Sequence, residues 1–332
     1  MASIIATAPG RCGIVGNPSD MYGGSVISCT TEERAECHLE LAGANIRLSN
    51  EDETATLRSR ADLALRGDKL DVARAAITFF GLDPADVHFS IRLRTDIPMR
   101  AGLAGSTALL TTLVGALGAY AGSSASLYHA AEMTRKVEAR VMQIVCGLQD
   151  QHMAAFGGLN FMDFVGKEQL EQRDDEPLAT VEPLASHVPP PPLLLAHTGV
   201  QHHSGEVHRS PRQRWLDGEP LVRSSYARIA DLARMAKRRM LEQDWRAVGP
   251  LMDENHRLIS ELGGSGPDND RLIEAARAAG AWGAKLAGAG GGGTIIALTP
   301  DPERVGAALL AAGADSLLTP RPQPGLTVTR NP

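Results

Sequence analysis

The chain has 332 residues, of which 43% are apolar, 22% charged and only 4% aromatic, and its formal net charge at pH 7 is −6. The length favours two domains over one, and the acidic balance argues against a protein that binds nucleic acid by neutralising phosphates. The 34 glycines and 20 prolines follow no repeat, which argues against a collagen-like chain and against general disorder.

Cysteine usage and hydropathy place the protein in a reducing, aqueous compartment. The cysteines show no CxxC spacing and are expected to be reduced thiols: Cys12, Cys29, Cys37 and Cys146. No window approaches the ~20 apolar residues of a membrane span, and the N-terminal stretch reaches proline and arginine before any signal-peptide core. We therefore expect a cytoplasmic protein with no membrane partner.

The first third of the chain mixes predicted strands with a predicted helix. Residues 25–48 and 86–94 alternate between apolar and polar side chains, which predicts strands. Residues 61–82 lie between them and have the three-and-four spacing of a helix, with Gly81 as its stop. After a glycine-rich turn, residues 106–122 predict a helix that is buried on all sides, because they contain no charged residue.

The remainder of the chain predicts a second domain. Residues 126–145 predict an amphipathic helix, and residues 166–192 then become acidic and proline-rich, which indicates a domain boundary between 1–188 and 189–332. Beyond it, the pattern predicts strands at 193–198 and 294–299 and helices near 221–243, 245–262, 268–279 and 301–313. This irregular order favours a two-domain α+β fold over a doubly wound sheet.

Glycine-rich segments mark three candidate turns. The first, residues 8–24, contains Arg11 and Asp20 and predicts either a ligand-binding loop after a strand or a simple glycine-rich hairpin. The third, residues 282–298, formally fits GxGxxG, but a strand rather than a helix follows it. A dinucleotide fold needs that helix, so an NAD-dependent enzyme ranks last.

The second segment, residues 98–110, runs from a glycine-rich loop straight into the apolar helix. Free backbone N–H groups and the helix dipole at such a position favour an anionic oxygen, and glycines let a phosphate approach the backbone. Ser106 and Thr107 add hydroxyls that reach a metal ion or simply cap the helix, with Ser106 as the candidate cap. The segment lacks the lysine of GxxxxGK[ST] and is not a Walker loop.

Together, in this order and at these separations, the three segments resemble the PGRxxxxG-like, PxxxGLxxSSA-like and GAGxGG-like segments of the GHMP kinase family. The resemblance implies an N-terminal α/β domain with a phosphate-binding glycine loop, a ferredoxin-like C-terminal domain, and transfer of a phosphoryl group from ATP with Mg²⁺. Within the family, GNPSD, GLAGSTA, GLQDQHMAAFGGLNFMDF and SGEVHRSPRQRWLDGE look most like glucuronokinases. GLQDQHMAAFGGLNF and KLAGAGGGG also resemble heptose 7-phosphate kinases.

The resemblance assigns the catalytic positions. Asp150 matches the aspartate that receives or orients the substrate hydroxyl, and Arg11 matches a basic residue beside the same hydroxyl and the transferred phosphoryl group. Glu138, together with Ser106 or Thr107, matches the magnesium ligands. The alternatives are a structural salt bridge for Arg11 and a solvated helix charge for Glu138. The implied ATP-binding residues are Pro98, Gly102, Leu103, Ala104, Gly105, Ser106, Thr107, Gly290 and Gly291.

The resemblance also implies a substrate. Asp20 aligns with a sugar-hydroxyl ligand, and Asn17 stands where galactokinase-like relatives carry an acidic residue, which suits a sugar acid. A uronate carboxylate calls for a bidentate arginine. The candidates are Arg212 and Arg214, with Arg100 behind them, and Tyr22 and Ser204 complete the expected substrate site. Alternatively, these arginines belong to a solvated loop and Tyr22 to the core; histidines 202, 203 and 208 are expected in the same polar loop rather than at zinc.

The activity so implied is transfer of the γ-phosphoryl group of ATP to the anomeric 1-hydroxyl of a sugar acid, with D-glucuronate as the expected substrate. Two alternatives stay open: a kinase of a heptose 7-phosphate or neutral sugar, and a catalytically silent relative that binds nucleotide or sugar.

Overall fold

The computed structural model describes residues 2–41, 43–98, 101–167, 176–199, 210–288 and 293–332. Several positions singled out from the sequence lie outside these ranges: Arg100, Ser204, Gly290, Gly291 and histidines 202, 203 and 208.

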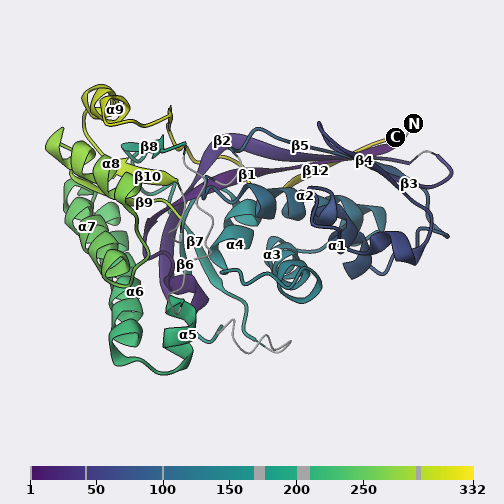
Figure 1. Ribbon diagram of the computed structural model, residues 1–332, viewed down its shortest axis with the longest axis horizontal. Coiled ribbons are helices and arrows are strands. Elements are labelled where there is room, and N and C mark those ends of the chain that lie inside the picture. Colours follow the sequence, from purple (N-terminus) through teal and green to yellow (C-terminus); the bar gives the residue numbers. More distant parts are fainter. Residues whose placement is uncertain (1, 42, 99–100, 168–175, 200–209, 289–292) are drawn as a thin grey trace.

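A large sheet organises the N-terminal part of the molecule (Figure 1). Within the described residues it has eight strands in the order β12-β1-β2-β5-β3-β4, and β6 and β7 extend it beside β2. The β3–β5 pair is parallel and the other pairs are antiparallel. The strands are β1 (Ser3–Val15), β2 (Ser25–Glu40), β3 (Ile46–Ser49), β4 (Thr54–Leu57), β5 (Ser90–Thr95), β6 (Leu159–Asp163), β7 (Thr180–Pro183) and β12 (Thr327–Asn331).

Helices cover one face of this sheet (Figure 1). They are α1 (Asp71–Phe79), α2 (Gly105–Tyr120), α3 (Leu127–Lys136) and α4 (Gln149–Phe156). Helix α2 is apolar around its circumference and packs on β1 and β2, so Leu110, Leu113 and Leu117 are all buried. The burial of this helix confirms its prediction and anchors the glycine loop that precedes it.

The C-terminal part contains a smaller sheet in the order β11-β8-β10-β9. Its strands are β8 (Leu193–His197), β9 (Gly283–Leu286), β10 (Thr294–Leu298) and β11 (Ser316–Leu318). Its helices are α5 (Pro211–Leu216), α6 (Pro220–Leu241), α7 (Trp245–Glu261), α8 (Pro267–Ala278) and α9 (Pro302–Ala311). One hydrophobic cluster joins both parts, because it includes Ile14 of β1, Ile229 of α6 and Leu195 of β8.

After β11 the chain returns to the first sheet. Strand β12 pairs antiparallel with β1, from Ser3 opposite Asn331 to Thr7 opposite Thr327. Just before β12, the backbone N–H of Gln323 donates to the hydroxyl of Thr30 at 2.7 Å. The C-terminal residues therefore form part of the sheet that carries Arg11, and both termini lie at the same end of the molecule (Figure 1).

Helix boundaries depart from the sequence pattern where local capping overrides it. The predicted helix at 61–82 is α-helical only over α1 and begins with a separate 3-10 turn at Arg60–Leu63. The two are separated because Gly67 has φ +81° and the Asp71 carboxylate accepts the N–H groups of Arg66 and Gly67. The predicted helix at 126–145 is shorter as well, since α3 passes into a π-helical turn at Val137–Val141. That turn ends the helix, and Glu138 lies within it.

Among the described residues, none of the helices combines the length and the apolar character that crossing a bilayer requires. The four cysteines form no disulfide with one another, and Cys12, Cys29 and Cys37 are buried.

Candidate active site

Arg11 and Asp150 form an ion pair at the centre of the site. The guanidinium Nε and Nη2 atoms lie 2.7 and 2.6 Å from Oδ1 of Asp150. The Arg11 side chain is 6% exposed and that of Asp150 is 28% exposed, so the carboxylate keeps one side open to a ligand. The pairing of β1 with β2 shifts register on either side of Arg11, and such irregularities redirect a side chain out of its strand.

The glycine loop before α2 lies against this ion pair. Arg11 Nη1 donates to the carbonyl oxygen of Gly102 at 2.5 Å, and its backbone N–H donates to Leu103 at 3.1 Å. Ala104 is the N-cap of α2 with φ +62°, and no side chain in the described part of the chain caps the helix. The suggested cap by Ser106 is therefore wrong, because Ser106 lies within the first turn. The N-terminal N–H groups of α2 are left available to an anion.

Glu138 lies beneath the first turn of α2. Its carboxylate accepts a hydrogen bond from the Thr107 hydroxyl at 2.6 Å and another from the Gln151 amide. Because burial removes water from this carboxylate, its pKa is raised to about 7. No described lysine or arginine pairs with it, so a cation would relieve the cost of its negative charge.

Asp20 holds the helix that carries Asp150. Its Oδ2 atom accepts the backbone N–H groups of Leu148 and Gln149, at 2.7 and 3.0 Å, at the start of α4. A side chain at Gly147 would collide with Asp20, since a Cβ there would lie 2.2 Å from Oδ2. Burial raises the pKa of Asp20, and the negative charge of Asp150 adds to the rise. Its Oδ1 atom accepts no hydrogen bond from the described residues and can receive a substrate hydroxyl.

Asn17 is bonded on both sides by the protein itself. Its Nδ2 atom donates to the carbonyl oxygen of Gly288 at 2.7 Å, and its Oδ1 atom accepts from Lys285 Nζ at 2.7 Å. The residue is 2% exposed. These contacts join the first glycine segment to the third, and they occupy the atoms that a sugar would otherwise use.

Tyr22 lies in an aromatic cluster beside Asp20. Its ring centroid is 4.1 Å from that of Tyr226 and 5.2 Å from that of Trp215. Burial raises the pKa of Tyr22, while the nearby Arg212 guanidinium opposes the rise and the charge of Asp20 adds to it. The charges of both Asp20 and Arg212 therefore act on Tyr22.

The two candidate arginines differ in their partners. Arg214 forms a two-pronged ion pair with Glu219, at 2.6 and 2.9 Å, and also reaches the carbonyl oxygen of Leu262. Arg212 is partly buried, and its Nε atom is buried without a hydrogen-bond partner among the described residues. A buried donor of this kind is costly unless a ligand satisfies it. Arg212 is therefore better placed than Arg214 to bind an anion.

A pocket of about 280 Å³ adjoins the glycine loop. Ser106 and Leu109 of α2 line it, and its other walls include Lys69, Val72 and Leu93. Its position at the first turn of α2 suits the base of a nucleotide whose phosphates bind the helix N-terminus. The sequence patterns did not identify this pocket, because its walls come from several separate segments between Asn50 and Met142.

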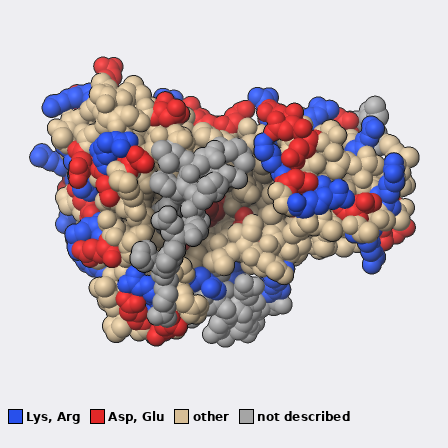
Figure 2. All heavy atoms as spheres, in the orientation of Figure 1, with Lys and Arg blue, Asp and Glu red and all other residues tan. Residues whose placement is uncertain are grey.

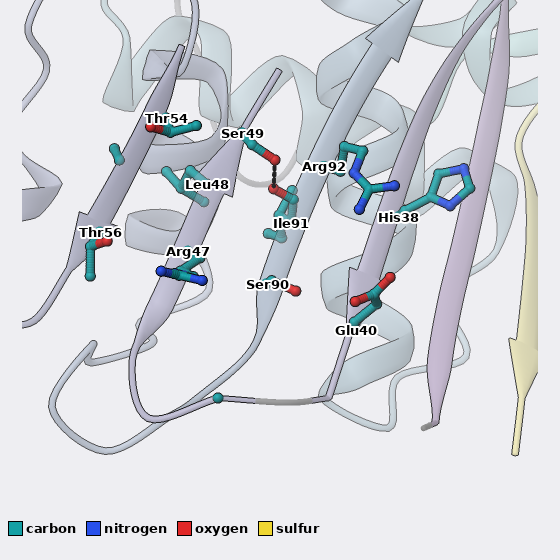
Figure 3. Close-up of a pocket in the computed structure, with 12 residues that line it drawn as sticks. His38, Glu40, Arg47, Leu48, Ser49, Thr54, Thr56, Ser90, Ile91 and Arg92 are labelled. Carbon is teal, nitrogen blue, oxygen red and sulfur yellow. Dashed lines mark hydrogen bonds between the residues drawn. The ribbon is translucent and has the colours of Figure 1, made fainter. Parts of the chain in front are cut away.

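A larger groove, of about 560 Å³, lies elsewhere and contains none of the predicted site residues. Figure 3 shows its walls on strands β2 to β5, with Arg47, Arg92 and His38 standing on the sheet and helices lying behind it. On the face drawn in Figure 2, basic and acidic residues are interspersed, and a recess lies between the two parts of the molecule.

His152, one helical turn from Leu148, makes stability sensitive to acid. The ring is fully buried, its Nδ1 lies 2.7 Å from the Leu148 carbonyl oxygen, and burial lowers its pKa to about 4. The unfolded chain takes up this proton first as pH falls from about 6.5, so we expect His152 to cost about 3 kcal/mol of unfolding free energy by pH 4.

Denaturant titrations across this pH range measure the effect. His152→Asn should flatten the slope, whereas the control His129→Asn, at an exposed position on α3, should retain it. An unchanged slope in His152→Asn would contradict the assignment.

Comparisons of the chain with known proteins all point to the same protein family. The description "GHMP kinases N terminal domain" matches residues 70–158, and "GHMP kinases C terminal" matches residues 229–315. The chain is 28% identical to the mevalonate kinase of Pyrococcus furiosus, over 98% of each chain. It is 29% identical to probable glucuronokinase 2 of Arabidopsis thaliana, over 88% of this chain and 83% of the relative.

A solved structure supports the fold. Lactococcus lactis galactokinase, crystallised with galactose, superposes with a TM-score of 0.75 at 17% identity and covers 98% of this chain and 95% of its own. The two family models together span just over half of the residues, from the start of α1 to the end of α4 and from within α6 to the residue before β11. The chain belongs to the GHMP kinase family, and it has the two-part α+β fold of those kinases.

Proposed function

We propose that the protein transfers the γ-phosphoryl group of ATP to the anomeric hydroxyl of a sugar acid, with D-glucuronate as the substrate. The observation that carries the substrate class is Arg212: its buried Nε has no hydrogen-bond partner among the described residues, and its charge acts on Tyr22. A carboxylate on the substrate would satisfy that donor. The relatives named glucuronokinases support the choice of sugar.

The proposed reaction uses the two partners of the Arg11–Asp150 ion pair. Asp150 receives the proton of the attacking hydroxyl, whose oxygen forms a bond to the γ-phosphorus as the bond to the bridging oxygen of ADP breaks. Arg11 holds Asp150 in place and lies beside the loop at Gly102, where it spreads the negative charge of the transferred group. The products are a sugar 1-phosphate and ADP, with the released proton first held on Asp150.

The nucleotide is proposed to bind along α2. Its phosphates would accept the free N–H groups after Ala104, and its base would enter the pocket lined by Ser106, Val72 and Leu93. Glu138 and Thr107, with Ser106, form an oxygen donor set that suits Mg²⁺, which keeps most of its ligands as water and phosphate. When bound, Mg²⁺ would neutralise phosphate charge; the residues of the chain orient the groups that react.

Arg212→Met should raise the KM for glucuronate about tenfold or more and leave kcat within about threefold, because the substrate carboxylate loses a charged hydrogen bond in both ground and transition states. Arg214→Met is the matched control, since Arg214 is paired with Glu219 and should affect stability rather than KM. A larger rise in KM in Arg214→Met than in Arg212→Met would contradict the proposal that Arg212 binds the substrate carboxylate.

The substrate is tested by ADP release with ATP, Mg²⁺ and a panel of acceptors. The panel contains glucuronate, galacturonate, galactose, mannoheptose 7-phosphate and mevalonate, the last because relatives named mevalonate kinases match 98% of the chain. We expect kcat/KM for glucuronate to exceed that for galactose at least about a hundredfold. Preference for mevalonate would be compatible with binding of a substrate carboxylate by Arg212 but would reject a sugar as the substrate. Turnover of galactose alone would reject both the carboxylate-binding role of Arg212 and D-glucuronate as the substrate.

A further inference from the structure

Lys285 on β9 is a buried lysine with no carboxylate partner among the described residues. It is 1% exposed, and its Nζ donates to Asn17 Oδ1 at 2.7 Å, to the Leu286 carbonyl oxygen, and to that of Gly13 at 3.5 Å. Three acceptors match the three hydrogens of an ammonium group. A buried lysine usually pairs with an acid, so this arrangement calls for an explanation beyond packing.

The contacts of Lys285 lead to the phosphate loop. Asn17, held by Lys285, donates to the carbonyl oxygen of Gly288. Gly288 in turn lies so close to Gly102 that a Cβ on Gly288 would be 3.1 Å from the Gly102 carbonyl oxygen. That same oxygen accepts the hydrogen bond from Arg11. The backbones of the third and second glycine segments therefore meet at the carbonyl oxygen of Gly102, to which Arg11 donates a hydrogen bond.

We propose that Lys285 is a positioning residue for the nucleotide: through Asn17 it fixes how closely Gly288 approaches Gly102, and so sets the shape of the loop that receives the phosphates. This inference rests on the proposed function. Lys285 touches neither substrate nor reacting atoms; it acts through the asparagine and the two glycines.

The charged groups around Lys285 define a pH signature. Burial is the main cause that lowers the pKa of Lys285 to about 7; Cys12 opposes this shift and the Arg11 cation on β1 adds to it. Its other titratable neighbours are Cys12 on β1, whose pKa burial raises to about 12, and His256 on α7, whose pKa is lowered. Neither of these neighbours titrates between pH 7 and 9. In that range Lys285 loses a hydrogen that one of its three acceptors needs, and the loop should loosen.

The test is the affinity for Mg²⁺ and the non-hydrolysable analogue AMP-PNP, measured by calorimetry from about pH 6.5 to pH 9. Lys285→Met removes the donors and keeps the length of the side chain. We expect its Kd to rise about tenfold at pH 6.5 and to vary less with pH than that of the wild type. In turnover, the KM for ATP should rise while kcat stays within about threefold.

Two further variants keep the test decisive. Asn17→Ser is too short to bridge Lys285 and Gly288, so it should reproduce the loss of affinity even if Lys285→Met fails to fold. Lys237→Met is the control, because Lys237 on α6 pairs with Glu182 on β7 and should leave the Kd unchanged. A wild-type Kd in folded Lys285→Met or in Asn17→Ser would overturn the positioning role. Failure of the wild type to bind AMP-PNP would overturn the proposed function itself.

Discussion

Replacing Asp150 with asparagine is expected to lower kcat about a thousandfold while the Kd for AMP-PNP stays within about threefold. The amide oxygen can still accept the hydrogen bonds of Arg11, so the ion-pair geometry is largely kept. The variant lacks the carboxylate that we propose receives the proton of the attacking hydroxyl. Steady-state ADP release and calorimetry on the same preparation separate the two quantities.

Asp231→Asn is the matched control, because Asp231 is an exposed carboxylate on α6 that pairs only with Arg234 among the described residues. It should leave kcat unchanged. A full rate in Asp150→Asn would remove Asp150 from the mechanism, and loss of nucleotide binding together with the rate would assign it a structural role instead.

The second large effect is expected at Arg11. Arg11→Met should lower kcat about a thousandfold, since an arginine beside a transferring phosphoryl group typically contributes at least that factor. The variant also leaves the Gly102 carbonyl oxygen without its donor, so the KM for ATP should rise as well. Single-turnover rates at saturating ATP measure the chemical step apart from binding.

The alternative, that Arg11 is only a structural salt bridge, makes a different prediction. Arg34 on β2 provides the comparison, because its guanidinium also bridges elements, from Thr7 to the carbonyl oxygens of Pro324 and Gly325. Arg34→Met should lower the melting temperature with kcat intact. If Arg11→Met behaves in the same way, the catalytic assignment is wrong.

The periodicity of apolar residues predicted the long helices and strands. It failed where local capping or hydrogen bonds between distant residues determine where an element begins or ends. The buried helix at α2 and the strand at β8 follow directly from their apolar residues. Helix α4 has only eight residues and mixes polar with small side chains, so it has no periodic signal, and its start depends on Asp20, more than a hundred residues earlier. Long-range hydrogen bonds of this kind are invisible to a local window.

The site residues likewise divide into those that the sequence predicted and those that only the structure identifies. Arg11 and Asp150 could be predicted to meet because motif spacing and family resemblance identify them, and the structure places them in contact. The sequence could not choose between Arg212 and Arg214, which are two residues apart; the choice depends on the pairing of Arg214 with Glu219. Lys285 was missed because its importance comes from burial against Asn17, which no spacing within either segment reveals.

The closing strand has a consequence for how the protein is made. Strand β1 carries Arg11, and its partner on one side, β12, is formed by residues 327–331. During synthesis, this side of β1 must therefore remain an unpaired sheet edge until residues 327–331 have left the ribosome. Exposed edges recruit other strands, and contacts of such sequence separation form slowly. Nascent chains stalled before residue 327 should thus be the species that most needs chaperone protection, even though most residues of the site have already been synthesised.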